Sequence, residues 1–275
     1  MLILNISDKL EKKFNLNSER YRELQRAGVF ILKLTVLGCY GPFPPAGGAC
    51  SGYLLQESDF NLLIDCGNGV LSRLQEHLDY QKIDAVILSH LHPDHVSDIM
   101  VMRYGLVIAL KEGLRSKPLQ LYAPTEPASE FERLPYKDCY EVNALQEGVS
   151  LQIGPFSVQN RLGLHAIPSM ALRINSKEKT LVYSGDTEYN RSLEKLAGDA
   201  DLFLCEANYQ DRDLQKGLPN HLSASQAAKL AAEAGAKRLL LTHHHPEKDQ
   251  AVSLVEAKEY YPEAELACEG EKYII

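Results

Sequence analysis

The chain lacks the sequence features of membrane-spanning and secreted proteins. No stretch approaches about 18 consecutive apolar residues, the length that a membrane-spanning helix needs. Residues 1–26 are charged and polar, with neither the apolar core nor the cleavage site of a secretory signal. These absences predict a cytoplasmic protein that does not contact a membrane.

Cysteine pairs and an excess of positive charge are also missing. The six cysteines are scattered, and no two form the C-x-x-C pair of a zinc knuckle or redox motif, so we expect reduced, buried thiols. Lys and Arg number 29 against 37 Asp and Glu, which gives a net charge of −8. Because nucleic-acid binding needs clustered Lys and Arg, this balance counts against an extended nucleic-acid surface, although a local basic patch is compatible with it.

The chain does have enough apolar sequence for a large core. Hydrophobic residues make up 45% of the 275 residues, which fits one large or two small globular domains. We divide the chain into a charged N-terminal extension, residues 1–29, expected to be helical, and a main domain, residues 30–275. The extension could be an extended start, a lid over a site, a packed peripheral helix or a dimerisation arm. The last of these would make the protein a homodimer.

Strand-like and helix-like segments alternate along the main domain. Apolar runs bounded by turn residues predict strands at 31–38, 51–56, 61–65, 84–89, 118–123, 150–153, 156–159, 170–174, 180–184, 201–205 and 238–242. Amphipathic segments predict helices at 70–78 and 96–110. A capping box of Ser223 and Gln226 begins a third helix, which Gly235 ends. This alternation indicates helices that cover two sheets.

The motif with the most potential metal ligands is S-H-L-H-P-D-H, residues 89–95. It holds three imidazoles and one carboxylate, ligand types that suit zinc and similar divalent cations. Because it follows an apolar run, we expect a loop at the carboxyl end of a strand, where α/β proteins usually place their sites. A solvated loop that is merely rich in histidine is the alternative, but imidazoles crowd unfavourably without a shared cation. The motif therefore predicts a metal site.

Isolated polar residues border the strands expected in the second half. They are His165 before one strand, and Asp186, Glu206 and one histidine of 243–245 after three others. His221 lies just before the capped helix, and a positive helix end beside a histidine could hold an oxyanion or phosphate.

In this order, H-x-H-x-D-H, a later lone histidine, G-D-T and L-T-H resemble the motifs of the metallo-β-lactamase fold superfamily, over roughly residues 31–275. The resemblance implies an α/β fold, the four-layered αββα sandwich, with two metal ions at the edge of the facing sheets. Seven side chains would hold these ions. The first ion would be held by His90, His92 and His165, and the second by Asp94, His95 and His243, with Asp186 bridging the two. A carboxylate suits the bridging position because it has two oxygens.

The same motifs separate branches of the superfamily. Antibiotic-cleaving dizinc members typically carry Cys where this chain has Asp186, and diiron members carry Glu where it has His92. Thioesterases similar to glyoxalase II usually continue the motif with Gly-Gly, whereas residues 96–98 are V-S-D here. The branch of ribonuclease Z and related phosphodiesterases resembles this chain more, through C-E-A at 205–207 and H-L-S at 221–223.

Two departures argue against tRNA as the substrate. Ribonuclease Z inserts a tRNA-binding arm between the lone histidine and G-D, but only 186 − 165 = 21 positions separate His165 from Asp186 here. Its P-x-K-x-R-N loop is also missing, and the chain is acidic. We therefore expect a small phosphodiester or nucleotide-like substrate rather than tRNA, and no membrane partner.

The resemblance also suggests catalytic roles for Asp94, His221 and Glu206. Asp94 would orient the attacking water or accept its proton, and His221 would act at the phosphate, with Glu206 as its partner. The alternatives are a structural residue that leads into the helix for His221 and a structural carboxylate for Glu206. The cofactors would be two divalent ions, Zn²⁺ first, with Mn²⁺ and Fe²⁺ compatible with the same ligands. A thioester or lactone hydrolase and a non-catalytic metal-binding protein remain the alternative functions.

Overall fold

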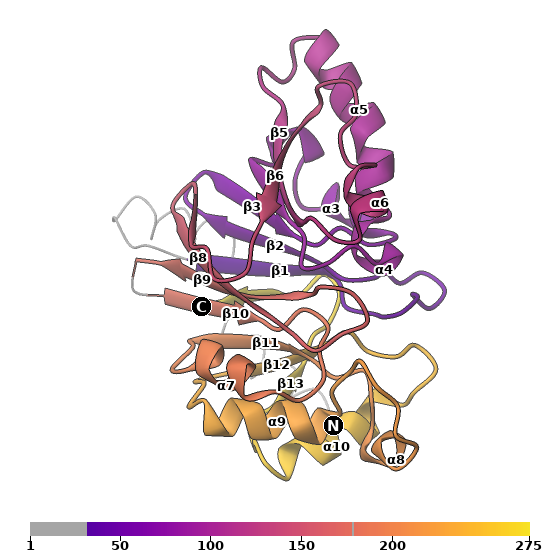
Figure 1. Cartoon of the computed structure of the whole chain (residues 1–275), viewed down its shortest axis with the longest axis vertical. Helices are drawn as coiled ribbons and strands as arrows, with labels where there is room; N and C mark the ends of the chain where they lie inside the picture. Colours follow the sequence, from indigo (N-terminus) through magenta and orange to yellow (C-terminus); the bar gives the residue numbers. More distant parts are fainter. Residues whose placement is uncertain (1–31, 178) are drawn as a thin grey trace, which may run out of the picture.

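Two sheets form the centre of the protein (Figure 1). The computed structural model describes residues 32–177 and 179–275, so the extension predicted at 1–29 lies outside the described residues. The strands of the first sheet are β1 (Leu32–Gly38), β2 (Gly52–Glu57), β3 (Phe60–Ile64), β4 (Ala85–Ile87), β5 (Leu119–Pro124), β6 (Tyr140–Leu145) and β14 (Lys272–Ile274). Those of the second are β7 (Leu151–Ile153), β8 (Phe156–Leu162), β9 (Met170–Ser176), β10 (Lys179–Tyr183), β11 (Leu202–Glu206), β12 (Leu239–Thr242) and β13 (Glu265–Leu266).

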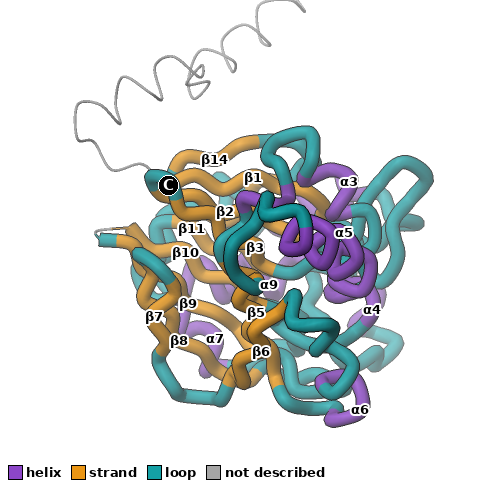
Figure 2. Tube along the Cα trace, turned by 90° about the horizontal axis from the view of Figure 1, so that it is seen from above, coloured by secondary structure: helices purple, strands orange, loops and turns teal. Residues whose placement is uncertain are grey.

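Helices cover the outer face of each sheet. The helices on the first sheet are α3 (Val70–Leu74), α4 (Pro93–Val96), α5 (Ile99–Lys111) and α6 (Ala128–Phe131), with a 3₁₀ turn η1 (Tyr80–Lys82). Those on the second are α7 (Arg191–Ala197), α8 (Asp211–Leu214), α9 (Ala224–Glu233) and α10 (Gln250–Lys258). Seen from above, α3 and α5 lie on one side of the strands, with α7 and α9 behind them (Figure 2). The predicted αββα sandwich is confirmed.

Three apolar clusters hold the four layers together. One lies between the sheets and includes Tyr53, Phe156 and Tyr183, all almost fully buried. A second packs the first sheet against α3 and α5, and a third packs the alanine-rich face of α9 against the second sheet. The removal of this apolar area from water is the main source of the free energy that stabilises such a fold.

Parallel pairing brings the carboxyl ends of distant strands to one edge. The strands β3, β4, β5 and β6 are parallel neighbours in the order β14-β1-β2-β3-β4-β5-β6. The strands β10, β11 and β12 are parallel neighbours in the order β13-β12-β11-β10-β9-β8-β7. Residues that follow β3, β4, β10, β11 and β12 can therefore meet at one edge of the sandwich, the usual site position in layered α/β folds.

Three local expectations were wrong. The helix predicted at 96–110 is interrupted after Val96, and α5 begins only at Ile99. Asp94 and His95 lie in the short helix α4 rather than in a loop, because Pro93 occupies its first position and starts a helical turn there. All six cysteines are free, but Cys268 is exposed rather than buried.

No helix in the described part of the chain is long and apolar enough to cross a membrane. The capping box predicted at the start of α9 is present: Ser223 Oγ accepts from the backbone of Gln226, and Gln226 Oε1 accepts from the backbone of Ser223.

Candidate metal centre

The predicted metal ligands come from five separate segments and meet at the shared sheet edge. His90 and His92 follow β4, Asp94 and His95 lie in α4, and His165 lies between β8 and β9. Asp186 follows β10 and His243 follows β12. Their ligand atoms form two adjoining groups, one of three imidazoles and one of two imidazoles and two carboxylates.

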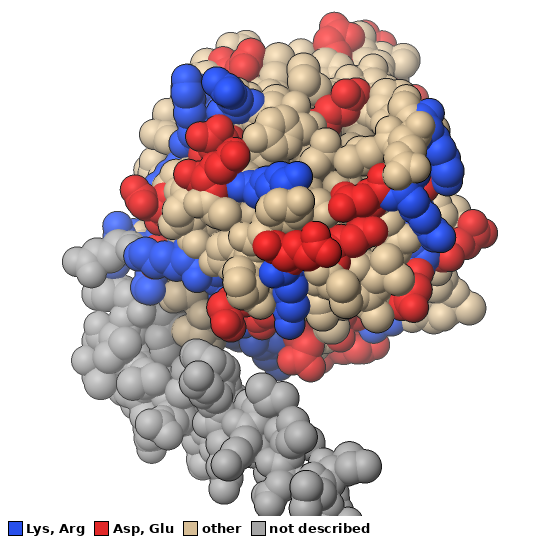
Figure 3. Space-filling view, turned by 90° about the horizontal axis from the view of Figure 1, so that it is seen from below, with Lys and Arg blue, Asp and Glu red and all other residues tan. Residues whose placement is uncertain are grey.

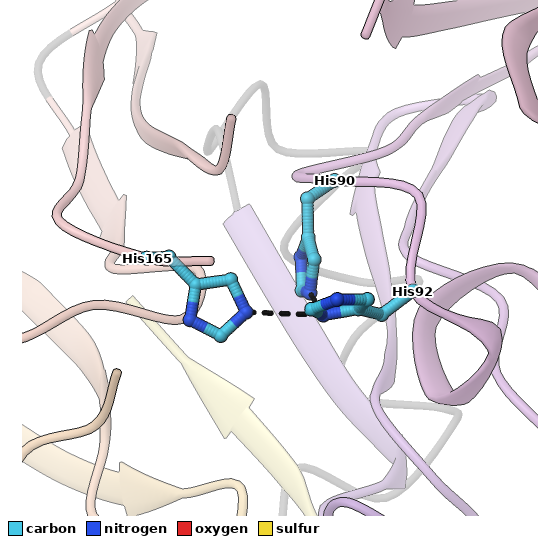
Figure 4. Close-up of side chains that lie close together, drawn as sticks. All are labelled: His90, His92 and His165. Atoms are coloured by element: carbon cyan, nitrogen blue, oxygen red, sulfur yellow. Dashed lines mark hydrogen bonds between the residues drawn. The ribbon is translucent and has the colours of Figure 1, made fainter. Parts of the chain in front are cut away.

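The first group consists of His90, His92 and His165, whose rings point toward one another (Figure 4). His92 Nδ1 lies 3.1 Å from His90 Nε2 and 3.0 Å from His165 Nε2. A ring nitrogen carries at most one proton, so these contacts cannot both be ordinary linear hydrogen bonds. Nitrogens bound tetrahedrally at zinc distances would lie about 3.3 Å apart, close to the observed spacing. The geometry fits a shared cation.

The second group consists of Asp94, His95, His243 and Asp186. His243 Nε2 lies 3.2 Å from Asp94 Oδ2 and 3.3 Å from His95 Nε2. His95 Nε2 lies 3.6 Å from Asp94 Oδ2. Two imidazole nitrogens and two carboxylates around one point are a donor set that suits zinc, manganese or iron.

Asp186 lies between the groups. Its Oδ2 is 3.7 Å from His90 Nε2 and 3.3 Å from His243 Nε2, and its Oδ1 is 3.4 Å from His95 Nε2. Oδ1 is buried and has no hydrogen-bond partner, which is uncommon for a buried carboxylate oxygen. Burial alone would raise the pKa of Asp186, but the surrounding imidazoles hold this pKa well below its usual value. An ionised carboxylate with an unpaired oxygen fits a bridging ligand.

The electrostatics of His90 and His95, both fully buried, also fit a cation. Burial and its histidine neighbours hold the pKa of His90 well below the usual value, so its imidazole is neutral and can act as a ligand. Burial would likewise lower the pKa of His95, but the carboxylates of Asp186, Asp94 and Asp65 raise it well above the usual value. These carboxylates favour positive charge at this point, which either a proton or a metal ion can supply.

Asp65 is a buried residue at the end of β3 to which the sequence assigned no role. Its Oδ2 accepts from His95 Nδ1, Ser89 Oγ and Tyr183 Oη, each at 2.8 Å. Because Asp65 can only accept, His95 is protonated on Nδ1 and its Nε2 lone pair faces the centre. Ser89 Oγ also lies 3.1 Å from His90 Nδ1 and orients that ring in the same way. The sequence signal was an Asp directly after a strand, beside the strand that carries the histidine motif.

Replacing Asp65 by asparagine should therefore weaken metal binding by about 10–100-fold, the usual effect of removing a carboxylate that orients a ligating histidine. The affinity can be measured by titration against a competing chelator, with Asp59→Asn in the exposed turn after β2 as the matched control. An unchanged affinity of Asp65→Asn would show that Asp65 does not orient His95.

His221 and Glu206 form a pair beside the metal groups. His221 Nδ1 lies 3.1 Å from Glu206 Oε1 and 3.9 Å from Asp186 Oδ2. The fully buried Glu206 carboxylate accepts from the backbone of Thr187 at 2.6 Å and of Leu222 at 3.2 Å. Burial would lower the pKa of His221, but Glu206 and the neighbouring carboxylates raise it to about 9. The proton on His221 Nδ1 is thus held by Glu206, which anchors the ring.

Five of the seven predicted ligands line one cavity of about 350 Å³ together with His221; they are His92, Asp94, His165, Asp186 and His243. Pro42, from the Gly- and Pro-rich loop after β1, also lines this cavity, so the loop forms part of the site. A Cβ atom at Gly41 would lie 1.9 Å from His243 Nε2, so only glycine allows the loop to pass this close to the ring. Of the neighbouring histidines, His244 packs against Tyr40 and His245 against Phe43, and neither belongs to a metal group among the described residues.

Comparison with known proteins identifies similar sequences and structures. The family described as “Beta-lactamase superfamily domain” matches residues 60–244, a range that contains all seven side chains of the two groups. The “Probable metallo-hydrolase YhfI” of Bacillus subtilis (strain 168) is 38% identical and covers 77% of this chain and 86% of its own. A crystal structure of a metallo-beta-lactamase fold protein of that name aligns with a TM-score of 0.86 and 35% identity, over 89% of this chain and 100% of that one.

Two ribonuclease Z proteins are more distant. Ribonuclease Z of Brevibacillus brevis is 28% identical and covers 74% of this chain and 84% of its own. The crystal structure of the human short-form tRNase Z aligns with a TM-score of 0.69 over 88% of this chain and 98% of that one, and at 23% identity it shows a common fold.

Proposed function

The chain belongs to the metallo-β-lactamase superfamily, in its ribonuclease Z-like branch, and from this premise we propose that it is a metal-dependent hydrolase of small phosphodiesters. One observation carries the proposal: the ring of His221, paired with the buried carboxylate of Glu206, shares a cavity with side chains of both candidate metal groups. A phosphodiester carries a negative charge that such a cavity stabilises, whereas a thioester or lactone is uncharged.

The seven side chains would hold two divalent cations, with His90, His92 and His165 at one, Asp94, His95 and His243 at the other, and Asp186 between them. Bound cations of this kind lower the pKa of a water molecule and polarise a phosphoryl oxygen. The donor atoms are all nitrogen or oxygen, a set that suits Zn²⁺ and equally accommodates Mn²⁺ or Fe²⁺.

The chain's own residues would supply the rest of the mechanism. Asp94 lines the cavity and would orient the attacking water and accept its proton. On the other side, the imidazolium of His221 would contact the phosphoryl group and donate a proton to the leaving oxygen. Glu206 would hold that imidazolium in place, because backbone donors fix its carboxylate.

A small substrate is favoured over tRNA. The 20 residues between His165 and Asp186 are largely taken up by the antiparallel pair β9 and β10, which leaves too few residues for an inserted arm. On the face of the molecule shown in Figure 3, Lys and Arg lie among Asp and Glu and form no continuous basic surface. The net charge of −8 also disfavours the binding of tRNA, whose phosphates are negative.

We expect the zinc- or manganese-loaded protein to hydrolyse bis(p-nitrophenyl) phosphate and His92→Ala to reduce kcat/KM by about 10³-fold or more, because the first metal loses a ligand. A panel of an aryl phosphodiester, a thioester and a lactone, assayed by product absorbance, tests this. His77→Ala, outside the cavity, is the matched control. Activity on thioesters or lactones alone would replace the proposal with the second hydrolase class, and full metal loading without any hydrolysis would indicate a metal-binding protein.

A further inference from the structure

A second hollow opens directly beside the metal cavity. It has a volume of about 360 Å³, and His92 and Pro93 line both hollows. We call it the α6 groove, after the short helix that forms one wall. The two hollows therefore adjoin at His92 and Pro93, and one ligand of modest size could reach from the metal cavity into the α6 groove.

Three segments form the α6 groove. Val96 and Met100 line it from α4 and α5, and Pro127 and Glu130 line it from the segment that contains α6. Ile167, two residues after His165, completes the lining from a third segment. In Figure 1 the helices α4, α5 and α6 lie together on the same side of the first sheet. Segments that carry metal-group histidines thus also shape the groove.

The floor of the α6 groove belongs to the apolar core of the first layer. Leu91 and Val96 are part of that core, at 2% and 6% exposed, and Met100 and Ile167 pack against it. An apolar surface that the packed core holds open is typical of a preformed small-molecule site, and a hollow of this size falls in the range of such sites.

The charge of the α6 groove is balanced. Its charged lining residues are Glu130 and Arg133, whose side chains pair with each other at 2.6 Å. The groove therefore offers no unpaired charge for an ionic group, in contrast to the neighbouring metal cavity, but it exposes apolar side chains to a ligand. An uncharged, apolar group gains most from displacing water there.

We propose that the α6 groove binds a flat, uncharged aromatic ring of the substrate while the phosphoryl group occupies the metal cavity. This inference rests on the proposed function and extends it to the substrate class: a phosphate ester with an aromatic group on one side. A ring matches the groove because it combines a large apolar area with edges that the Glu130–Arg133 pair at the rim can contact.

The test compares the binding of phenylphosphonate and methylphosphonate to the metal-loaded full chain by isothermal titration calorimetry. Neither compound is a phosphodiester, and the two differ only in the ring. We expect phenylphosphonate to bind about 10-fold tighter or more, a modest discrimination for an apolar pocket. Equal affinities, or binding of neither compound, would overturn the inference.

Two variants locate the preference in the α6 groove. Met100→Trp and Glu130→Trp fill the groove from two different helices, α5 and α6, and each should equalise the two affinities while methylphosphonate still binds. Ser129→Trp, on the exposed side of the same short helix, is the matched control and should keep the preference. A ring preference that survives both filling variants would overturn the inference. Hydrolysis of methyl p-nitrophenyl phosphate by the same preparations tests the proposed function separately, since its absence leaves the binding result intact.

Discussion

Asp186→Ala is expected to purify without its two metal ions and to lose phosphodiester hydrolysis. Asp186 is the carboxylate whose oxygens face histidines of both groups, at 3.7 Å from His90 and 3.4 Å from His95. Removing it takes a ligand from each ion and also the negative charge that would lie between two dications. We therefore expect metal content to fall from two per chain toward none and kcat/KM to fall by about 10³-fold or more.

Metal content by plasma mass spectrometry, together with far-UV circular dichroism to confirm folding, measures this result. Asp59→Ala, in the exposed turn between β2 and β3, is the matched control and should keep both ions and full activity. If Asp186→Ala retained two ions per chain, the bridging assignment would be wrong.

The second large effect is expected for His221→Ala. Its imidazole ring lines the metal cavity but is held by Glu206, so its removal should leave both metal groups intact. Loss of a preorganised donor to a developing oxyanion typically lowers kcat by about 10²–10³-fold. We expect that loss in kcat at unchanged metal content, with a smaller change in KM.

Steady-state kinetics on bis(p-nitrophenyl) phosphate measures this effect, and His245→Ala, whose ring packs against Phe43, is the matched control. A kcat within about twofold of the parent chain would instead make His221 a structural residue that leads into α9. Loss of metal would show that His221 is itself a ligand, since it lies near His165 and Asp186.

The metal groups could be predicted because their signal is local. The motif at 89–95 concentrates four donors in seven residues, and Asp186 and His243 each follow a short apolar run that is typical of a buried strand. Parallel pairing then accounts for the meeting of these strand ends, because β10, β11 and β12 all end at one edge. The alternation of strands and helices predicted two sheets covered by helices, and the resemblance to the superfamily implied their αββα order.

Other parts of the site depend on contacts between segments distant in sequence. Asp65 has no motif, and its role arises only because β3 pairs in parallel with β4 and places the carboxylate under His95 and Ser89. Gly41 matters because a loop crosses His243 at close range. The α6 groove combines three segments that are distant in sequence, and no local pattern shows that they meet.

The edge strands β6, β13 and β14 were not predicted for a different reason. They are short or half exposed, so they lack the continuous apolar run of the inner strands. The sequence did not predict the interruption between α4 and α5, because apolar residues lie on both sides of Ser97 and Asp98. Asp98 is buried there and accepts from the backbone of Leu71, a tertiary contact that the local sequence does not show.

The most direct test of the central claim is a zinc titration of the metal-free chain, followed by hydrolysis of bis(p-nitrophenyl) phosphate at each addition. Two adjoining ligand groups that share Asp186 predict that activity rises to its maximum at two equivalents of zinc per chain. Full activity at one equivalent, or hydrolysis that does not depend on added metal, would contradict the account.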